Sequence, residues 1–216
     1  MKLYNSLGPN PRLVRMFLLE KGLTLPFEEL DILGGENRRE PYLSKQPSGQ
    51  MPALQLDDGR VLGETIAICE YLEEKHPKPA LIGSTAEERA ETRMWQRRIE
   101  LGITEHLFNG FRFAEGLALF KSRIVTVPEA AAGLKSIKQD RLAWLDRQLE
   151  GKTWIAGERF TVADIQLFVA LDFGATVGQP LDPKLGNVTA WFGRVGKRPS
   201  AEASLHPAAK AAGMKG

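Results

Sequence analysis

The chain has 216 residues, of which 43% are hydrophobic and 26% are charged, and these values are typical of folded globular proteins. Lys and Arg number 29 against 27 Asp and Glu, so the net charge of +2 gives no reason to expect nucleic acid or an anionic membrane as a partner. The single cysteine, Cys69, excludes an intrachain disulfide, and the lack of a secretion signal or of an apolar run of about 18–20 residues predicts a cytoplasmic protein with no membrane segment.

The first 75 residues alternate strand-like and helix-like patterns in the order β-α-β-α-β-β-α, which indicates a small α/β unit. Asp57-Asp58-Gly59 predicts a tight turn between the last two strands, and Gly22 predicts the end of the first helix. The expected strands cover residues 2–5, 27–32, 53–56 and 60–62, and the expected helices cover 13–21, 36–45 and 64–75.

A proline-containing linker follows, because Pro77 and Pro79 remove backbone donors and disfavour helix in the residues before them. After it, strand patterns almost vanish. Helices are expected from residue 84 towards 113, over 128–149, from a Thr161/Asp164 capping box onward, and over 191–195 and 200–212. We therefore expect one domain over 1–76, a linker over 77–84 and an all-helical domain over 85–216.

Three motifs stand in order along this pattern: QPSGQMPAL at residues 46–54, GETIAI at 63–68 and GERFTVADI at 157–165. Each alone is weak, but together with the two-part architecture they make the whole chain resemble the cytosolic glutathione S-transferase superfamily. The nearest likeness is to atypical bacterial and fungal members without an obvious catalytic Tyr or Cys. The resemblance implies an N-terminal thioredoxin-like domain followed by a helical bundle, with glutathione as co-substrate and no metal or prosthetic group.

The resemblance also implies a glutathione site in the first domain. In the family, the peptide bond at the position of Met51-Pro52 is cis and turns the preceding backbone towards the glutathione cysteine; an ordinary trans proline opening a strand is the alternative. Thr65 and Glu64 come where a strand gives way to a helix, and a helix N-terminus suits the γ-glutamyl carboxylate of glutathione. The alternative is that Thr65 only caps its own helix. Weaker candidates for contacts with glutathione are Gln50, Asn37 and Lys45. Lys45 either binds the glycyl carboxylate or is a solvated surface charge.

The group that activates the glutathione thiol is left open by the sequence. A free thiol with a pKa near 8.5 is only a few per cent ionised at neutral pH, so the protein must favour the thiolate. The family uses a Tyr or Ser hydroxyl, or a Cys, in or just after the first strand. Here Asn10, Ser6, and a backbone amide or water are the candidates, while Tyr4 lies inside the strand. Cys69 is expected to be a packed core thiol, which argues against disulfide exchange.

The second substrate is expected to be a small hydrophobic electrophile, with Phe108 and Arg112 of the helical domain lining its pocket. An aromatic cluster at helical spacing is more often core than pocket, so this assignment rests on the family position. Arg89, Arg93 and Arg97 recur every four residues and fit either a solvated helix face or the two-fold interface of a homodimer.

The function expected from this resemblance is conjugation of the glutathione thiolate to small electrophiles, in the manner of detoxification enzymes. Two alternatives stay open: a non-catalytic glutathione-binding or regulatory module of the same fold, and a glutathione-dependent peroxidase or dehalogenase. Neither nucleic acid nor membrane is expected as a partner.

Overall fold

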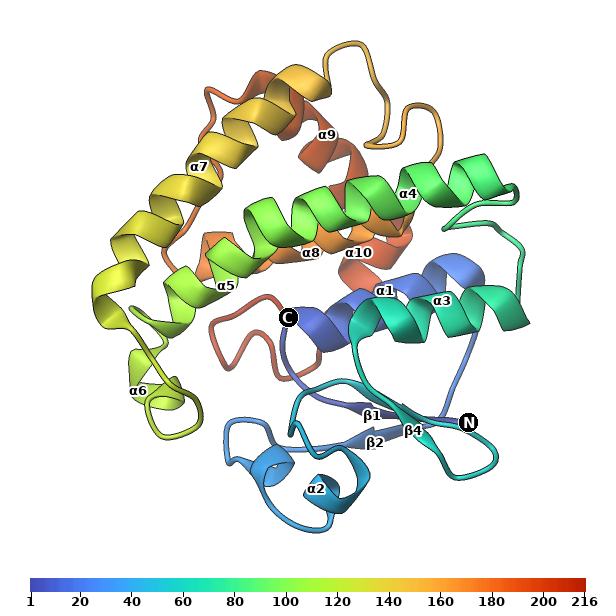
Figure 1. Ribbon diagram of the computed structural model, residues 1–216, viewed down its shortest axis with the longest axis vertical. Coiled ribbons are helices and arrows are strands. Elements are labelled where there is room, and N and C mark those ends of the chain that lie inside the picture. The colour runs from blue at the N-terminus through green and yellow to red at the C-terminus, as the bar shows by residue number, and fades with distance from the viewer. The chain divides into compact units, whose positions relative to one another are not determined.

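The computed structural model describes residues 1–216, which fold into two compact units (Figure 1). The first unit comprises Met1–Leu81 and Pro199–Gly216, and the second comprises Ile82–Arg198. Residues 199–216 were expected in the helical domain, yet they pack with the first unit. The reason is a pair of buried arginines: Arg12 Nη2 donates to the Ala201 carbonyl and Arg15 Nε to the Ser204 carbonyl, each at 2.8 Å.

The first unit is built on a four-stranded mixed sheet in the order β2-β1-β3-β4. β1 is parallel to β2 and antiparallel to β3, and β3 is antiparallel to β4. β2 is shorter than the expected strand 27–32, because its only neighbour, β1, ends at Asn5. The strands are β1 (Lys2–Asn5), β2 (Phe27–Glu29), β3 (Ala53–Gln55) and β4 (Val61–Leu62).

Helices α1 (Pro9–Lys21) and α3 (Thr65–Lys75) lie side by side in this unit and start at the same end of it (Figure 1). Phe17 of α1 and Leu72 of α3 are fully buried, as apolar residues at helical spacing predict. Gly22 ends α1 in the left-handed conformation, with φ of 64°, as the sequence predicted.

Two expected helices of this unit are shorter than predicted. The stretch 36–45 is split into the 3₁₀ turn η1 (Glu36–Arg38) and α2 (Tyr42–Lys45), with Pro41 between them. α10 covers only Pro199–Ala203 instead of 200–212. Pro207 prevents the helix from continuing to 212, because a proline has no N–H and disfavours helix in the residue before it.

The second unit is helical throughout, and its long first helix confirms the prediction for residues 84–113. α4 (Ala86–Ile99) passes through the π-helical turn η2 (Glu100–Thr104) into α5 (Glu105–Arg112) without interruption, and Thr85 caps its start. The central helix, α8 (Val162–Thr176), is buried along nearly its whole length. The remaining elements are α6 (Leu117–Phe120), η3 (Pro128–Ala130), α7 (Ala131–Gln148) and α9 (Gly186–Gly196). No helix of the chain is long and apolar enough to cross a membrane.

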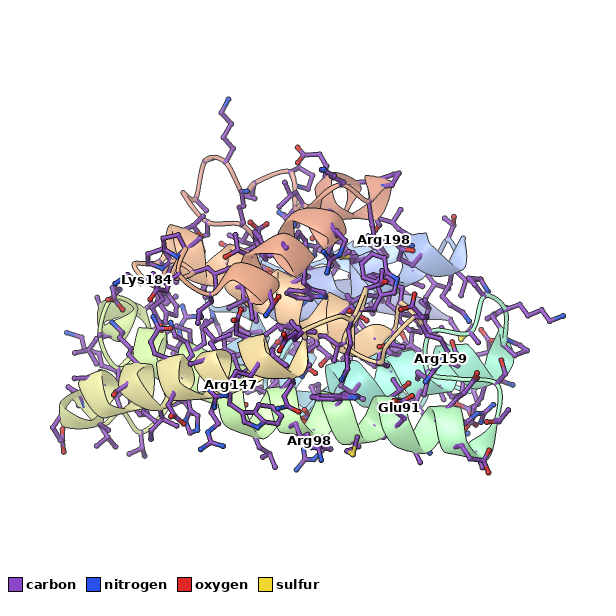
Figure 2. The ribbon with its side chains drawn as sticks, turned by 90° about the horizontal axis from the view of Figure 1, so that it is seen from above. Glu91, Arg98, Arg147, Arg159, Lys184 and Arg198 are labelled. Carbon is purple, nitrogen blue, oxygen red and sulfur yellow. The ribbon has the colours of Figure 1, made fainter.

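The fully buried carboxylate of Asp164 fastens the start of α8 to its surroundings. It accepts hydrogen bonds from the backbone N–H of Thr161 at 2.9 Å, from that of Ile155 at 3.0 Å and from Trp191 Nε1 at 2.8 Å. This confirms the predicted capping box and adds two partners from other segments. Nearby, Arg159 of the same motif contacts Glu91 of α4 at 2.8 Å, as Figure 2 shows.

We expect Asp164→Ala to destabilise the second unit by at least about 3 kcal/mol, because three buried donors lose their acceptor and each costs about 1–3 kcal/mol. All four tryptophans lie in this unit, so their fluorescence during urea unfolding reports on it. Asp140→Ala, at an exposed position of α7, is the control and should change the free energy of unfolding by less than about 0.5 kcal/mol. Equal effects of the two variants would contradict this role of Asp164.

Candidate functional site

The turn that leads from β1 to α1 is held by side chains behind it. Arg15 Nη1 donates to the Asn5 Oδ1 at 2.7 Å and to the Ser6 carbonyl at 2.9 Å. The Ser6 hydroxyl itself donates to the Leu30 carbonyl at 2.6 Å, and the residue is 1% exposed. Its proton is therefore engaged within the protein, which leaves Ser6 poorly placed to donate to a bound thiolate.

The first turn of α1 offers very few hydrogen-bond donors. Gly8 has φ of 135°, which requires glycine, and the N–H of Arg12 already bonds the Gly8 carbonyl at 3.1 Å. Pro9 and Pro11 have no N–H. The Asn10 backbone N–H is thus the single free donor of this turn, and its partly exposed side-chain amide adds a second donor beside it.

Tyr4 is packed and not presented to a ligand. It is 1% exposed, and its hydroxyl donates to Gln55 Oε1 at 2.9 Å. The ammonium of Lys45 lies 4.9 Å over its ring. Lys45 also lines a hollow of about 310 Å³ that β2 and residues 36–42 share, and no other residue predicted to bind glutathione lines that hollow.

The loop before β3 is fixed from η1 and α2. Asn37 Nδ2 donates to the Gly49 carbonyl and the Tyr42 hydroxyl to the Gln50 carbonyl, both at 2.6 Å. Burial raises the pKa of Tyr42, so this hydroxyl keeps the proton that it donates. The Gln50 side chain is exposed, and the Met51–Pro52 peptide bond is cis, as the resemblance implied.

The residue before α3, Glu64, has an unusual backbone. Its φ of 63° with ψ of 119° makes it the only non-glycine residue of the chain with positive φ. Such a conformation costs about 1–3 kcal/mol and clusters at functional sites. Glu64 makes no side-chain cap, and the first helical hydrogen bond starts at the Ile68 N–H, so the N–H groups of Thr65 and the next two residues are left without a helical acceptor.

These three segments meet at one end of the first unit. Tyr4 pairs with Ala53 across the antiparallel ladder, which places Met51–Pro52 beside the end of β1. The starts of α1 and α3 lie at this same end (Figure 1). The helix starts that carry Asn10 and Thr65 therefore lie at the same end of the unit as Met51–Pro52, whereas the ammonium of Lys45 is turned to the Tyr4 ring.

The residues predicted for the electrophile pocket lie in an aromatic cluster of the second unit. The Arg112 guanidinium is 5.9 Å from the Phe108 ring centroid and 5.7 Å from that of Phe120, and Phe108 packs edge-on against Phe173 at 6.1 Å. Phe108 and Arg112 are partly exposed, while Leu107 beside them is fully buried.

Cys69 is fully buried in α3, and burial raises the pKa of its thiol well above the usual value. This agrees with a packed core cysteine. No motif in the sequence predicted the part that Arg12 and Arg15 play behind the turn; the only signal was a pair of arginines three residues apart among the apolar residues of α1.

Comparison with known proteins identifies the family. The family model "Glutathione S-transferase, N-terminal domain" matches residues 3–80, and "Glutathione S-transferase, C-terminal domain" matches residues 116–199. The crystal structure of a glutathione S-transferase domain-containing protein from Marinobacter aquaeolei is 35% identical with a TM-score of 0.87, covering 93% of this chain and 100% of that one. The chain belongs to the glutathione S-transferase family.

Two curated relatives show the range within this glutathione S-transferase family. Glutathione S-transferase 2 of Saccharomyces cerevisiae is 29% identical over 92% of this chain and 86% of its own length. FtsZ-localized protein A of Caulobacter vibrioides is 32% identical over 73% of this chain and 69% of its own length. Both match most of the chain, but only one carries the name of a transferase.

The backbone of Glu64 gives a test of stored strain in this family member. Glu64→Gly should be more stable than Glu64→Ala by about 1–2 kcal/mol, because glycine adopts this positive φ without steric cost. At Glu74, an exposed residue inside α3, the order should reverse by about 1 kcal/mol. Urea unfolding followed by circular dichroism measures both pairs, and the same order at both positions would rule the strain out.

Proposed function

We propose that this protein is a glutathione transferase that joins the glutathione thiolate to small hydrophobic electrophiles. The observation that supports this best is the first turn of α1, where Asn10 is the only residue with a free backbone donor, at the end of the unit where the cis Met51–Pro52 loop and the start of α3 also lie. Membership of the family adds the co-substrate to that geometry.

Glutathione binding in this proposal uses backbone groups more than side chains. The free N–H groups at the start of α3 and the Thr65 hydroxyl receive the γ-glutamyl carboxylate, because a helix N-terminus favours an anion. Glu64 faces the ligand's ammonium, the Met51 backbone pairs with the cysteinyl residue, and Gln50 adds a side-chain contact. Lys45 reaches the glycyl carboxylate only if its ammonium leaves the Tyr4 ring.

The thiolate is stabilised by Asn10 in this proposal. Lowering a thiol pKa by about 2 units takes about 2.7 kcal/mol, and hydrogen bonds to a charged group contribute about 1.5–3 kcal/mol each. Two donors from Asn10, backbone and side chain, are therefore enough. Ser6 is the weaker candidate because its proton is given to Leu30.

The reaction itself needs no group beyond glutathione. The thiol proton leaves to solvent, a sulfur lone pair forms the carbon–sulfur bond, and the leaving group departs with the electron pair of the broken bond. Where the electrophile is an activated alkene, its carbon takes up a proton instead. Phe108 and Arg112 suit an electrophile with an apolar body and a polar or acidic substituent.

A second candidate function is a glutathione-binding module without catalysis. The relative from Caulobacter, named for its localisation with FtsZ, supports this alternative, because its name describes a place in the cell and not a reaction.

We further infer a cytoplasmic homodimer. The exposed Met94 and Leu101 on the α4–η2 helix, beside Arg93 and Arg97, support an interface there.

The proposal is tested by titrating the ultraviolet thiolate absorbance of glutathione against pH, with and without the protein. A transferase should lower the pKa of the bound thiol by about 1–2 units relative to free glutathione. Binding with an unchanged thiol pKa would favour the non-catalytic module. No binding of glutathione would refute both functions.

The same titration separates the two candidate activators. Asn10→Ala should raise the pKa of the bound thiol and slow turnover about tenfold, because one charge-assisted hydrogen bond is lost. Ser6→Ala should leave the thiol pKa unchanged, although it removes the bond to Leu30 and lowers the free energy of unfolding by about 1 kcal/mol. The opposite pattern would assign the role to Ser6; no change in either would leave the Asn10 backbone or a water as donor.

A further inference from the structure

The segment after α10, residues 206–216, returns to the start of α1 (Figure 1). Gly216 is buried, and a methyl group added to it would come within 2.7 Å of the Gly8 Cα and 2.9 Å of the Gly8 nitrogen. The two backbones are thus in van der Waals contact. Gly8 is the residue that precedes the first turn of α1, so this segment lies next to the only free donors of that turn.

His206 links this segment to the sheet and to its own end. His206 Nε2 lies 3.0 Å from Glu29 Oε2, and the His206 N–H donates to the Gly216 carbonyl at 3.1 Å, which closes the segment into a loop. Within the loop, the Ala208 N–H donates to His206 Nδ1 at 3.1 Å. Ala209, 5% exposed, is its one deeply buried side chain.

The attachment changes sharply at Leu205. Before it, Arg12 and Arg15, both buried, bind the carbonyls of Ala201 and Ser204. After it, the anchoring carboxylate of Glu29 is exposed and most residues of the segment face solvent. Segments with few buried apolar contacts open locally at low free-energy cost while the rest of the fold stays intact.

We propose that residues 206–216 form a strap that closes over the first turn of α1 and lifts to admit glutathione. The claim that the strap lifts for glutathione rests on the proposed function. The claim that the strap covers the first turn of α1 does not. Because only the open form binds, the apparent affinity for glutathione is reduced by the fraction of molecules in which the strap is open.

Closure is tested without glutathione by placing a reporter thiol at the turn. Cys69 is fully buried with a raised pKa, so in Asn10→Cys the new thiol is the one that iodoacetamide labels. Adding His206→Ala, which removes the contact to Glu29, should speed this labelling about threefold to tenfold. Ala209→Asp, which puts a charge at the buried alanine, is a second way to release the strap.

Glu74→Cys, exposed on α3, is the matched control, and its labelling rate should not respond to either strap variant. If both strap variants leave the Asn10→Cys rate unchanged, or change the two reporters equally, the strap does not cover the turn and the proposal fails.

Opening is tested with S-methylglutathione, which binds without reacting. Amide hydrogen exchange in residues 206–216 of the unmodified chain should become faster when this probe is bound, and His206→Ala should bind it about threefold to tenfold tighter. Unchanged or slower exchange would overturn the coupling. If S-methylglutathione binds neither protein, the proposed function is refuted, and so is the idea that the strap admits glutathione. The labelling rates of Asn10→Cys with and without the strap variants would still show whether the strap covers the turn.

Discussion

The arrangement of the candidate site depends on one buried guanidinium. Arg15 binds Asn5 and Ser6 at the end of β1 and the Ser204 carbonyl beyond α10, so two segments far apart in sequence share one cation. Burial lowers its pKa to about 10, which still leaves it protonated at neutral pH, and the Glu29 carboxylate is the charge that favours this form. A buried cation is costly without hydrogen-bond acceptors, so moving either segment would remove acceptors that this guanidinium needs. The turn is therefore fixed from behind by a buried side chain.

A second constraint acts on the face of that turn. Asn10 lies between Pro9 and Pro11. These prolines start the helix with a preset φ, but they remove the N–H groups that would otherwise help to bind an anion. The dipole of α1 still points its positive end outward, so stabilisation of a negative charge is concentrated on one residue. At the start of α3 the opposite holds, since three free N–H groups stand in a row behind a strained Glu64. In the proposed function the two helix starts therefore bind different anions, a single sulfur at α1 and a two-oxygen carboxylate at α3.

Much of the fold could be predicted because its signals are local. Gly22, the Asp57-Asp58-Gly59 turn and the Thr161/Asp164 capping box each act within a few residues of themselves. That residues 199–216 pack with the first unit could not be predicted, because it depends on hydrogen bonds from Arg12 and Arg15 across nearly 190 residues of sequence. At the site, the positions of Thr65 and of the Met51–Pro52 bend followed from motifs. The loss of the Ser6 proton to Leu30 and the turn of Lys45 onto Tyr4 depend on neighbours brought by folding, so no pattern along the chain carries them.

The position of Cys69 limits the chemistry that this site can support. It is the only thiol of the chain and is fully buried, so the protein offers no sulfur of its own for a mixed disulfide with glutathione. In the proposed function the reacting sulfur therefore comes from glutathione, and the protein's part is to hold the tripeptide and favour its ionised form. Neither task needs a flexible nucleophile, and both benefit from rigid backbone donors. That division explains why the predicted contacts fall on helix starts and a cis-proline bend instead of on a reactive side chain.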